Sequence, residues 1–208
     1  MADLRTGTYW NHMTGEALYG PLVGNTLQVE SVIHTTVKQV LAEDPNALVA
    51  ISDHPQAAAR VRRAGSLAQL LERIPGVPQM FPATMGNEDD RRERMDIGIG
   101  LWGDGGARYY PMETVIAEGG ALLDRFDGRT VLVYNDPTAR ALLALRTDAG
   151  GVRWEGDVLH LSTGERIEEG VLLHASGERA QVDRPLQVFT RWYGFSLTFP
   201  DTEIYSGH

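Results

Sequence analysis

The chain has 208 residues, a length that allows one larger domain or two small ones. Either arrangement can bury a hydrophobic core large enough for stability without disulfides or structural metal ions. A formal net charge of −9 excludes a nucleic-acid-binding surface, which needs clustered Lys and Arg residues to displace counterions. The absence of cysteine excludes disulfides, thiolate metal sites and a cysteine nucleophile. The 23 glycines and 10 prolines favour many turns and short elements, and therefore a β-rich fold.

The N-terminal residues Met1–Gly7 lack the apolar core of a signal peptide. No window approaches the roughly 18 consecutive apolar residues of a membrane-spanning helix. We therefore expect a cytoplasmic chain without a membrane partner.

Residues 8–33 alternate short apolar pairs with turn residues, a pattern typical of short strands joined by tight turns. The last part of this segment, residues 27–33, is predicted to be a strand. Thr35 and Thr36 can cap a short helix, which must end before Pro45 because the residue that precedes a proline disfavours the α region.

The apolar run at residues 47–51 predicts a buried strand. Two short helices are predicted next, at residues 56–63 and 67–74, and a capping-box pattern precedes the second. Residues 76–94 show no periodicity and are predicted to be a loop or linker.

The second half of the chain has the pattern of short strands separated by turns. Gly103–Gly106 and Phe126–Arg129 are predicted hairpin turns. Residues 139–146 fit a strand or a helix by pattern, and their continuous apolar character fits a buried strand better. The further predicted strands are residues 95–101, 107–111, 130–134, 152–154, 158–161 and 171–173.

An internal repeat is predicted from two matches that occur in the same order. The sequence Thr-Gly-Glu at residues 14–16 recurs at residues 163–165, and residues 35–46 match residues 190–201 from Thr through Pro to Asn or Asp. On this hypothesis the first half-repeat is incomplete. Residues 98–154, which precede the second Thr-Gly-Glu sequence, have no counterpart before the first.

Together these patterns predict a mainly β fold of the α+β class, with short strands, tight turns and a few short helices. We expect a first half with a helical insertion, a loop, and a second half that forms one compact unit with the first. These parts are residues 1–75, 76–94 and 95–208.

The segment from Thr6 to Ala17, followed by Gly20–Leu22, resembles the signature of the bacterial and archaeal domain-of-unknown-function family numbered 3179. Many similar members carry a Cys-Pro-Leu-Cys segment, which this cysteine-free chain lacks, so their thiolate chemistry is not carried over. The family label implies no activity, and the resemblance supports the fold and the repeat. Further segments that resemble the family in the same order are His34–Thr36, Asp44–Pro45, Ala107–Pro111, Val131–Pro137, Trp192–Phe195 and Phe199–Glu203.

The stretch Tyr9–Leu22 is the densest in groups that could carry chemistry. His12 and Glu16, together with His34, could hold a divalent transition metal such as Zn, Cu or Fe, because these ions take imidazole and carboxylate ligands. The alternative interpretation makes the same three side chains ordinary turn and helix-start residues.

Aromatic residues suggest a second kind of site, for a small-molecule ligand. If the two halves pack face to face, Trp10 and Trp192 could line one cleft near Tyr110, with Arg108 and Arg191 as anion-binding forks. The alternative is aromatic core packing with arginines at its rim.

We interpret the chain as a metal-binding or small-molecule-binding protein with a site near Trp10–Glu16. One alternative is a metal-assisted hydrolase or lyase that uses the same cluster, with Glu16 or Asp136 as the general base. Another is a homodimerising structural module without catalysis, whose exposed sheet edge needs covering. The sequence leaves open whether the protein is an enzyme.

Overall fold

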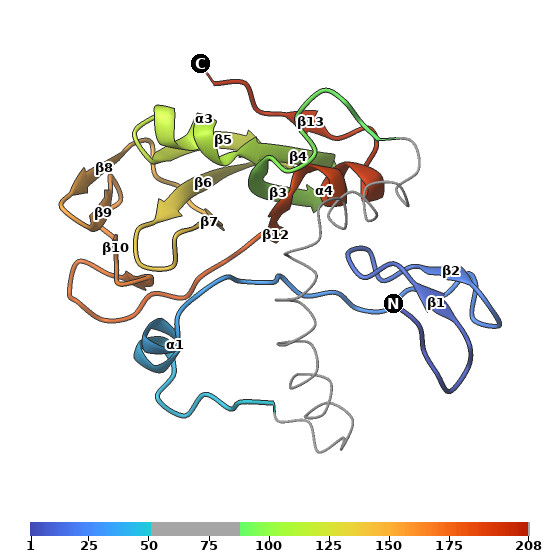
Figure 1. Cartoon of the computed structure of the whole chain (residues 1–208). Coiled ribbons are helices and arrows are strands. Elements are labelled where there is room, and N and C mark those ends of the chain that lie inside the picture. The colour runs from blue at the N-terminus through green and yellow to red at the C-terminus, as the bar shows by residue number, and fades with distance from the viewer. Residues whose placement is uncertain (51–87, 208) are drawn as a thin grey trace, which may run out of the picture.

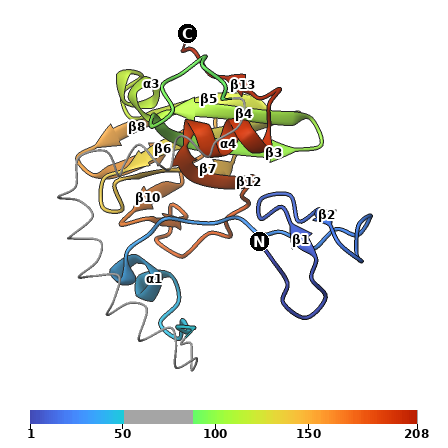
Figure 2. The same cartoon turned by 45° about the vertical axis from the view of Figure 1, so that its right-hand side comes forward.

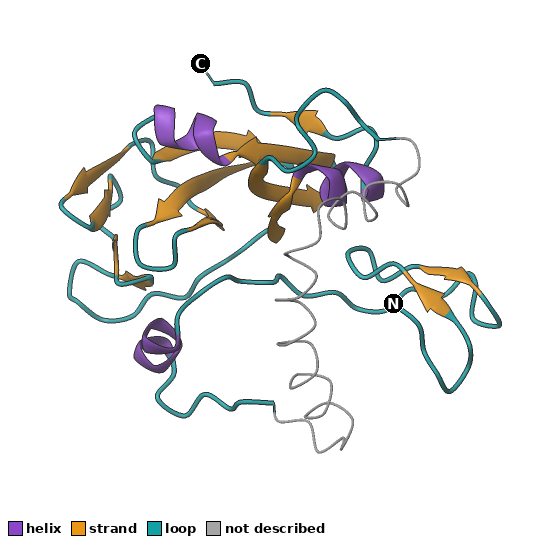
Figure 3. Ribbon diagram, in the orientation of Figure 1, coloured by secondary structure: helices purple, strands orange, loops and turns teal. Residues whose placement is uncertain are grey.

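The computed structural model describes residues 1–50 and 88–207. Strands predominate, and they form several small sheets with three short helices in the described part of the chain (Figures 1 and 3). The mainly β prediction is therefore confirmed. The helices are α1 (Val37–Glu43), α3 (Met112–Ala117) and α4 (Trp192–Thr198).

Three sheets belong to the second half of the chain. The first has the strand order β12-β3-β4-β13, the second β5-β6-β7 and the third β11-β10-β9-β8. Neighbouring strands are antiparallel except for the pair β4 and β13. The strands are β3 (Ile97–Gly103), β4 (Gly106–Pro111), β5 (Ala121–Phe126), β6 (Arg129–Asp136), β7 (Ala141–Arg146), β8 (Val152–Glu155), β9 (Val158–Leu161), β10 (Arg166–Glu168), β11 (Val171–Leu173), β12 (Leu186–Arg191) and β13 (Glu203–Ile204).

Strand β6 lies at the centre of the packing because both of its faces are buried. Val131 and Val133 pack with residues of β3, β4 and α3, whereas Leu132 and Tyr134 pack with residues of β9, β10 and β11. Successive side chains of a strand point to opposite faces, so the sheet β5-β6-β7 is the middle layer between the other two. This double burial accounts for the nearly continuous apolar sequence of β6 and β7.

The outer face of the first sheet is covered by helix α4. Phe195 and Trp192 of this helix pack on Tyr109 of β4. A Cβ atom at Gly100 would lie 2.0 Å from the Phe195 ring, so the glycine is required for this close approach. Met13 from the N-terminal part of the chain joins the same cluster and attaches that part to the body.

The edge of β7 is closed by a side chain from β12. Gln187 is fully buried; its Oε1 accepts a hydrogen bond from Ala144 N at 2.8 Å, and its Nε2 donates to Ala144 O at 2.9 Å. The amide of this side chain therefore takes the place of a neighbouring strand and satisfies a buried peptide group.

Helix α1 forms as its sequence predicts. Thr36 is the N-cap, and its side chain and that of Gln39 complete a capping box. The helix ends at Glu43, before Pro45. Gln39 Nε2 also donates to Asp136 Oδ2 at 2.8 Å, which fastens the helix to the end of β6.

Two strand predictions in the first half are wrong. Residues 27–33 are extended but form only an isolated parallel bridge, between Val32 and Val188 of β12. Residues 47–50 form no strand, and Leu48 is 97% exposed. In both segments the apolar pattern is present without the neighbouring strands that a ladder needs.

Several other predictions lie in part outside the described residues. Residue 51, the helices at 56–63 and 67–74, and residues 76–87 of the predicted loop are in this group. Residues 88–94 have neither helix nor strand, as predicted. In the second half, the hairpin turns and the strand at 139–146 are confirmed.

The two Thr-Gly-Glu sequences both lie between antiparallel strands. The first separates β1 (Tyr9–Trp10) from β2 (Ala17–Tyr19), and the second separates β9 from β10. Helices α1 and α4 occupy matching places in the two longer segments and have seven residues each. These facts agree with a repeat, and the duplication itself stays a prediction.

No helix within residues 1–50 and 88–207 is long and apolar enough to cross a membrane.

Candidate functional site

The loop between β1 and β2 is held by its own backbone and by one side chain. Asn11 Oδ1 accepts hydrogen bonds from the backbone N–H groups of Met13 at 2.9 Å and Thr14 at 3.2 Å. Gly15 N donates to Asn11 O at 2.9 Å. These bonds fix an Asx turn, so Asn11, Thr14 and Gly15 shape the loop.

A cavity of about 490 Å³ lies against Trp10, between residues 1–3 and residues 22–27. Trp10 is 6% exposed, and Leu22 and Leu27 contribute aliphatic walls. Asp3 and Thr26 are among the polar residues that line it. The site thus combines an aromatic surface and aliphatic walls with a few polar groups, as ligand sites usually do.

The carboxylate of Asp3 accepts hydrogen bonds from two nearby groups. Hydrogen bonds from the Thr6 hydroxyl and from the Arg5 backbone N–H lower the pKa of its carboxyl. The indole Nε1 of Trp10 makes no hydrogen bond to any residue of the described ranges 1–50 and 88–207. An acceptor and a donor are thereby available to a ligand.

The structure does not bring the predicted metal ligands together. His12 and Glu16 are exposed on the loop, and the ring of His34 lies edge-on to Phe189 with 5.4 Å between the ring centroids. Among the described residues, no group of three or more His, Asp or Glu side chains is placed to hold a metal ion. The geometry therefore gives no support to a metal site formed by these three residues.

Arg108 and Tyr110 belong to a network at the edge of the first two sheets. Arg108 Nη1 lies 2.6 Å from Asp124 Oδ2, and Nη2 pairs with Glu203. The Tyr110 hydroxyl donates to the same Asp124 oxygen at 2.9 Å. Burial, followed by the nearby Asp124 carboxylate, raises the pKa of Tyr110 above its ordinary value. The Arg108 guanidinium is thus already engaged by two carboxylates.

The other two residues of the predicted ligand set lie near helix α4. Trp192 is fully buried, and its Nε1 donates to Asp89 O at 2.8 Å. Arg191 is exposed, with its Nη1 3.9 Å from the sulfur of Met95. The cavity at Trp10 is lined by the N-terminal segment, whereas Trp192 packs inside the body.

Asp136, one candidate general base, is buried at the end of β6. Its Oδ1 accepts from the backbone N–H groups of Thr138 and Ala139, both at 2.8 Å, and its Oδ2 accepts from Gln39. These contacts give Asp136 a structural role that connects a turn to helix α1. The other candidate, Glu16, is exposed beside the β1–β2 turn.

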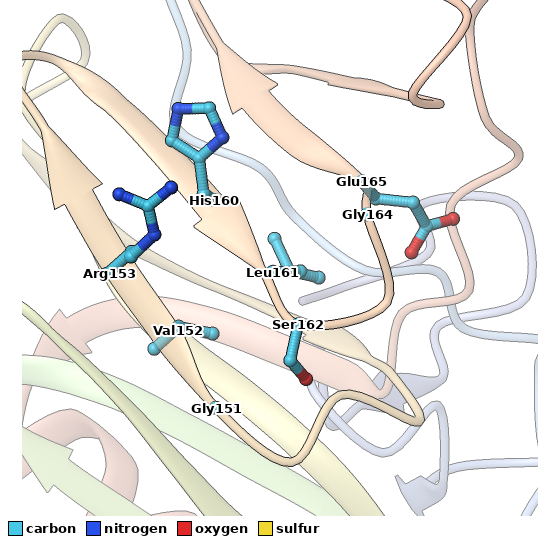
Figure 4. A pocket seen from close by; sticks show the side chains of 8 residues that line it. All are labelled: Gly151, Val152, Arg153, His160, Leu161, Ser162, Gly164 and Glu165. Carbon is cyan, nitrogen blue, oxygen red and sulfur yellow. The ribbon is translucent and has the colours of Figure 1, made fainter.

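Two more hollows lie beside the second Thr-Gly-Glu turn and were not predicted from the sequence. One, of about 420 Å³, is shown in Figure 4, where the side chains of Arg153 and His160 lie side by side and that of Glu165 points away from them. Arg153 and His160 are cross-strand partners on β8 and β9, and both pair with Glu155. The other, of about 530 Å³, shares Gly164 and Glu165 with the first and is also lined by Arg146.

The sequence profile of a family described as "Protein of unknown function (DUF3179)" matches residues 1–202. The chain belongs to this family. The match covers the β1–β2 hairpin, the cavity at Trp10 and both later hollows, so all of them are parts of the DUF3179 region. Comparison with curated proteins gives no match. Comparison with solved structures also gives none. Any function of this DUF3179 member must therefore be argued from its own geometry.

Proposed function

We propose that the protein binds a small, largely apolar molecule in the cavity against Trp10. The observation that carries the proposal is the composition of that cavity, in which an indole ring and aliphatic side chains surround about 490 Å³ of space. Burial of apolar ligand surface against such walls supplies the affinity, and a few polar groups fix the orientation.

The polar groups suggest how the ligand is oriented. The carboxylate of Asp3 can accept a hydrogen bond, and the hydroxyl of Thr26 can accept or donate one. The Nε1–H of Trp10 can donate one. A ligand with an aromatic or aliphatic body and one hydroxyl or amine group satisfies these groups. Purely charged molecules gain little from the aliphatic walls.

The test compares two leucines of the same N-terminal region. Leu27 lines the cavity and is 44% exposed, whereas Leu18 is 59% exposed and does not line it. We expect saturation-transfer NMR to show indole binding to the native protein and to Leu18→Asn, and a loss of about tenfold in affinity for Leu27→Asn. Equal binding by both variants, or no binding of indole, phenol or benzylamine at millimolar concentration, would contradict the proposal.

A second candidate function is self-association through the β1–β2 hairpin. Large apolar side chains are exposed on and beside it: Tyr9 54%, Leu18 59%, Tyr19 72% and Val23 59%. Tyr9 and Tyr19 lie with their ring centroids 6.2 Å apart, and exposed apolar groups that gather in this way can mark an interaction site. Light scattering should then show that the native protein is a dimer. The double variant Leu18→Ser with Tyr19→Ser should be a monomer. A native protein that is monomeric at about 0.1 mM, well above usual dimer dissociation constants, would exclude self-association.

A further inference from the structure

The 530 Å³ hollow beside the second Thr-Gly-Glu turn is lined by charged groups from separate parts of the chain. Arg146 and Asp148 come from the end of β7, Glu165 from the turn between β9 and β10, His174 from the end of β11, and Asp183 from the segment before β12. Neither the proposed ligand site at Trp10 nor the packing of the sheets uses this group. Its walls are more polar than those of the Trp10 cavity.

Arg146 has an unused hydrogen-bonding edge. Its Nη1 donates to Asp183 Oδ1 at 3.0 Å, and a longer contact of 3.5 Å joins it to Arg184 O. Its Nε is buried and has no hydrogen-bond partner in the described part of the chain. Its Nη2 likewise makes no hydrogen bond within residues 1–50 and 88–207.

The Nε–H and one Nη2–H of a guanidinium point in the same direction, and together they form the edge that binds a carboxylate through two parallel hydrogen bonds. The Arg146 side chain is 21% exposed, so part of it is open to the hollow. Nε itself is buried, so a ligand reaches both donors only when the guanidinium rotates about its Cδ–Nε bond. A buried donor without a partner is costly, so a ligand oxygen there is favourable.

The positive charge of Arg146 is only partly compensated. Asp183 is shared, because Arg129 Nη1 also lies 2.7 Å from its Oδ2. Burial tends to raise the pKa of Asp183, but hydrogen bonds from Arg129 and Arg146 outweigh it and lower that pKa. Two guanidinium groups thus share one ionised carboxylate, so Asp183 does not fully compensate the charge of Arg146.

Two further carboxylates, Glu165 and Asp148, also line the hollow. Glu165 Oε2 accepts from the Thr163 hydroxyl at 3.2 Å, and Glu165 Oε1 lies 3.6 Å from His174 Nδ1. Asp148 forms no ion pair with any described residue. These carboxylates repel an anion that fills the whole hollow, but they accept hydrogen bonds from hydroxyl groups. The ligand therefore needs a carboxylate at one end and hydrogen-bond donors at the other.

We propose that this hollow binds a small polyhydroxylated carboxylic acid, with its carboxylate on the Nε and Nη2 edge of Arg146 and its hydroxyl groups on Asp148 and Glu165. A sugar acid has this chemistry. Neither a simple carboxylate nor a neutral sugar makes both sets of contacts.

Titration calorimetry with gluconate, acetate and glucose tests the proposal on the full chain. We expect gluconate to bind about tenfold more tightly than acetate or glucose, since only gluconate makes both kinds of contact. Arg146→Lys removes the two-donor edge and should weaken gluconate binding by about tenfold, whereas Arg153→Lys, an exposed arginine of β8, should leave it unchanged. Equal affinity for all three probes, or gluconate binding that survives Arg146→Lys, overturns it.

A second variant keeps the test independent of folding defects. Asp148→Asn removes a negative charge from the hollow, so acetate should bind severalfold more tightly than to the native protein. A gain of affinity cannot result from a misfolded protein. If the affinity for acetate falls or stays the same, Asp148 does not face the ligand and the proposed orientation is wrong.

Discussion

Two hairpins of this protein share the turn sequence Thr-Gly-Glu but differ in what surrounds them. In the β9–β10 hairpin, Leu159 and Ile167 are buried against the sheet β5-β6-β7. In the β1–β2 hairpin, Leu18 and Tyr19 are exposed. Figures 1 and 2 show the β1–β2 hairpin at the periphery, away from the stacked sheets that hold β9 and β10.

The comparison separates what local sequence determines from what tertiary packing determines. Both turns have a glycine with positive φ and lie between antiparallel strands, so local chemistry is sufficient for the turn. Burial requires a second apolar surface. The later hairpin packs its strand residues on such a surface, whereas the first reaches the core through Met13 and leaves Leu18 and Tyr19 exposed. The same turn therefore connects two strands of a packed layer in one place and two strands with exposed apolar side chains in the other.

The largest expected effect is on the packed hairpin. Leu159→Ala removes a fully buried side chain and should lower the free energy of unfolding by about 2–5 kcal/mol, because it leaves a cavity between two sheets. Leu18→Ala, in the exposed hairpin, should change it by less than about 0.5 kcal/mol. Urea unfolding followed by circular dichroism measures both.

Similar losses for the two leucine variants would show that the β1–β2 hairpin is packed as firmly as its counterpart. A loss of less than about 1 kcal/mol for Leu159→Ala would instead contradict the central position of the β9–β10 hairpin. Either result would remove the contrast between the two hairpins.

A smaller difference is expected at the two turn glycines. Gly15 has φ +72° and Gly164 φ +94°, so alanine at either position costs about 1–2 kcal/mol of left-handed strain. A Cβ at Gly15 would also lie 2.3 Å from Leu27 O, whereas the nearest atom to one at Gly164 is 3.9 Å away. Gly15→Ala should therefore cost about 1 kcal/mol more than Gly164→Ala.

Amide hydrogen exchange measures the first glycine variant locally, because the peripheral hairpin can open without global unfolding. Protection of the amides of Trp10, Gly15 and Ala17 should fall in Gly15→Ala and stay unchanged in Gly164→Ala. The opposite order would mean that the contact between the first turn and Leu27 does not limit the hairpin.

The elements that the sequence predicted are those with a complete local signal. Helix α1 has its cap at Thr36 and its stop at Pro45, and the hairpin at Asp127 has the Asp-Gly turn that such a connection requires. The sequence did not predict strands β5, β10, β12 and β13 or helices α3 and α4. The strand prediction for residues 47–50 failed because burial depends on a partner that an apolar run does not specify.

The sequence predicted one residue of the candidate site, Trp10, but not the other residues that line the cavity. Trp10 was selected from the density of aromatic and polar groups, and a cavity does lie against it. Its other walls, such as Asp3 and Leu27, come from flanking segments that no pattern in the hairpin indicates. Arg146 was also missed, because its free donor edge results from how Asp183 and the β7 terminus meet in space.

The smallest of the expected effects concerns a tyrosine of the packed body and its pH dependence. Tyr110→Phe removes the hydrogen bond to Asp124 and should cost about 1–2 kcal/mol at pH 7. Tyr9→Phe, on the exposed hairpin, should change stability by less than about 0.5 kcal/mol. Both values follow from urea midpoints measured under the same conditions.

The sign of the pH effect follows from the raised pKa of Tyr110, caused first by burial and then by the Asp124 carboxylate. The unfolded chain releases the tyrosine proton at about pH 10, while the folded chain retains it, so stability is complete below that pH and falls as the pH rises above it. Tyr110→Phe should make this alkaline decline less steep. An equal slope for the native protein and Tyr110→Phe would mean that Tyr110 reaches solvent, which would contradict its burial between the sheets.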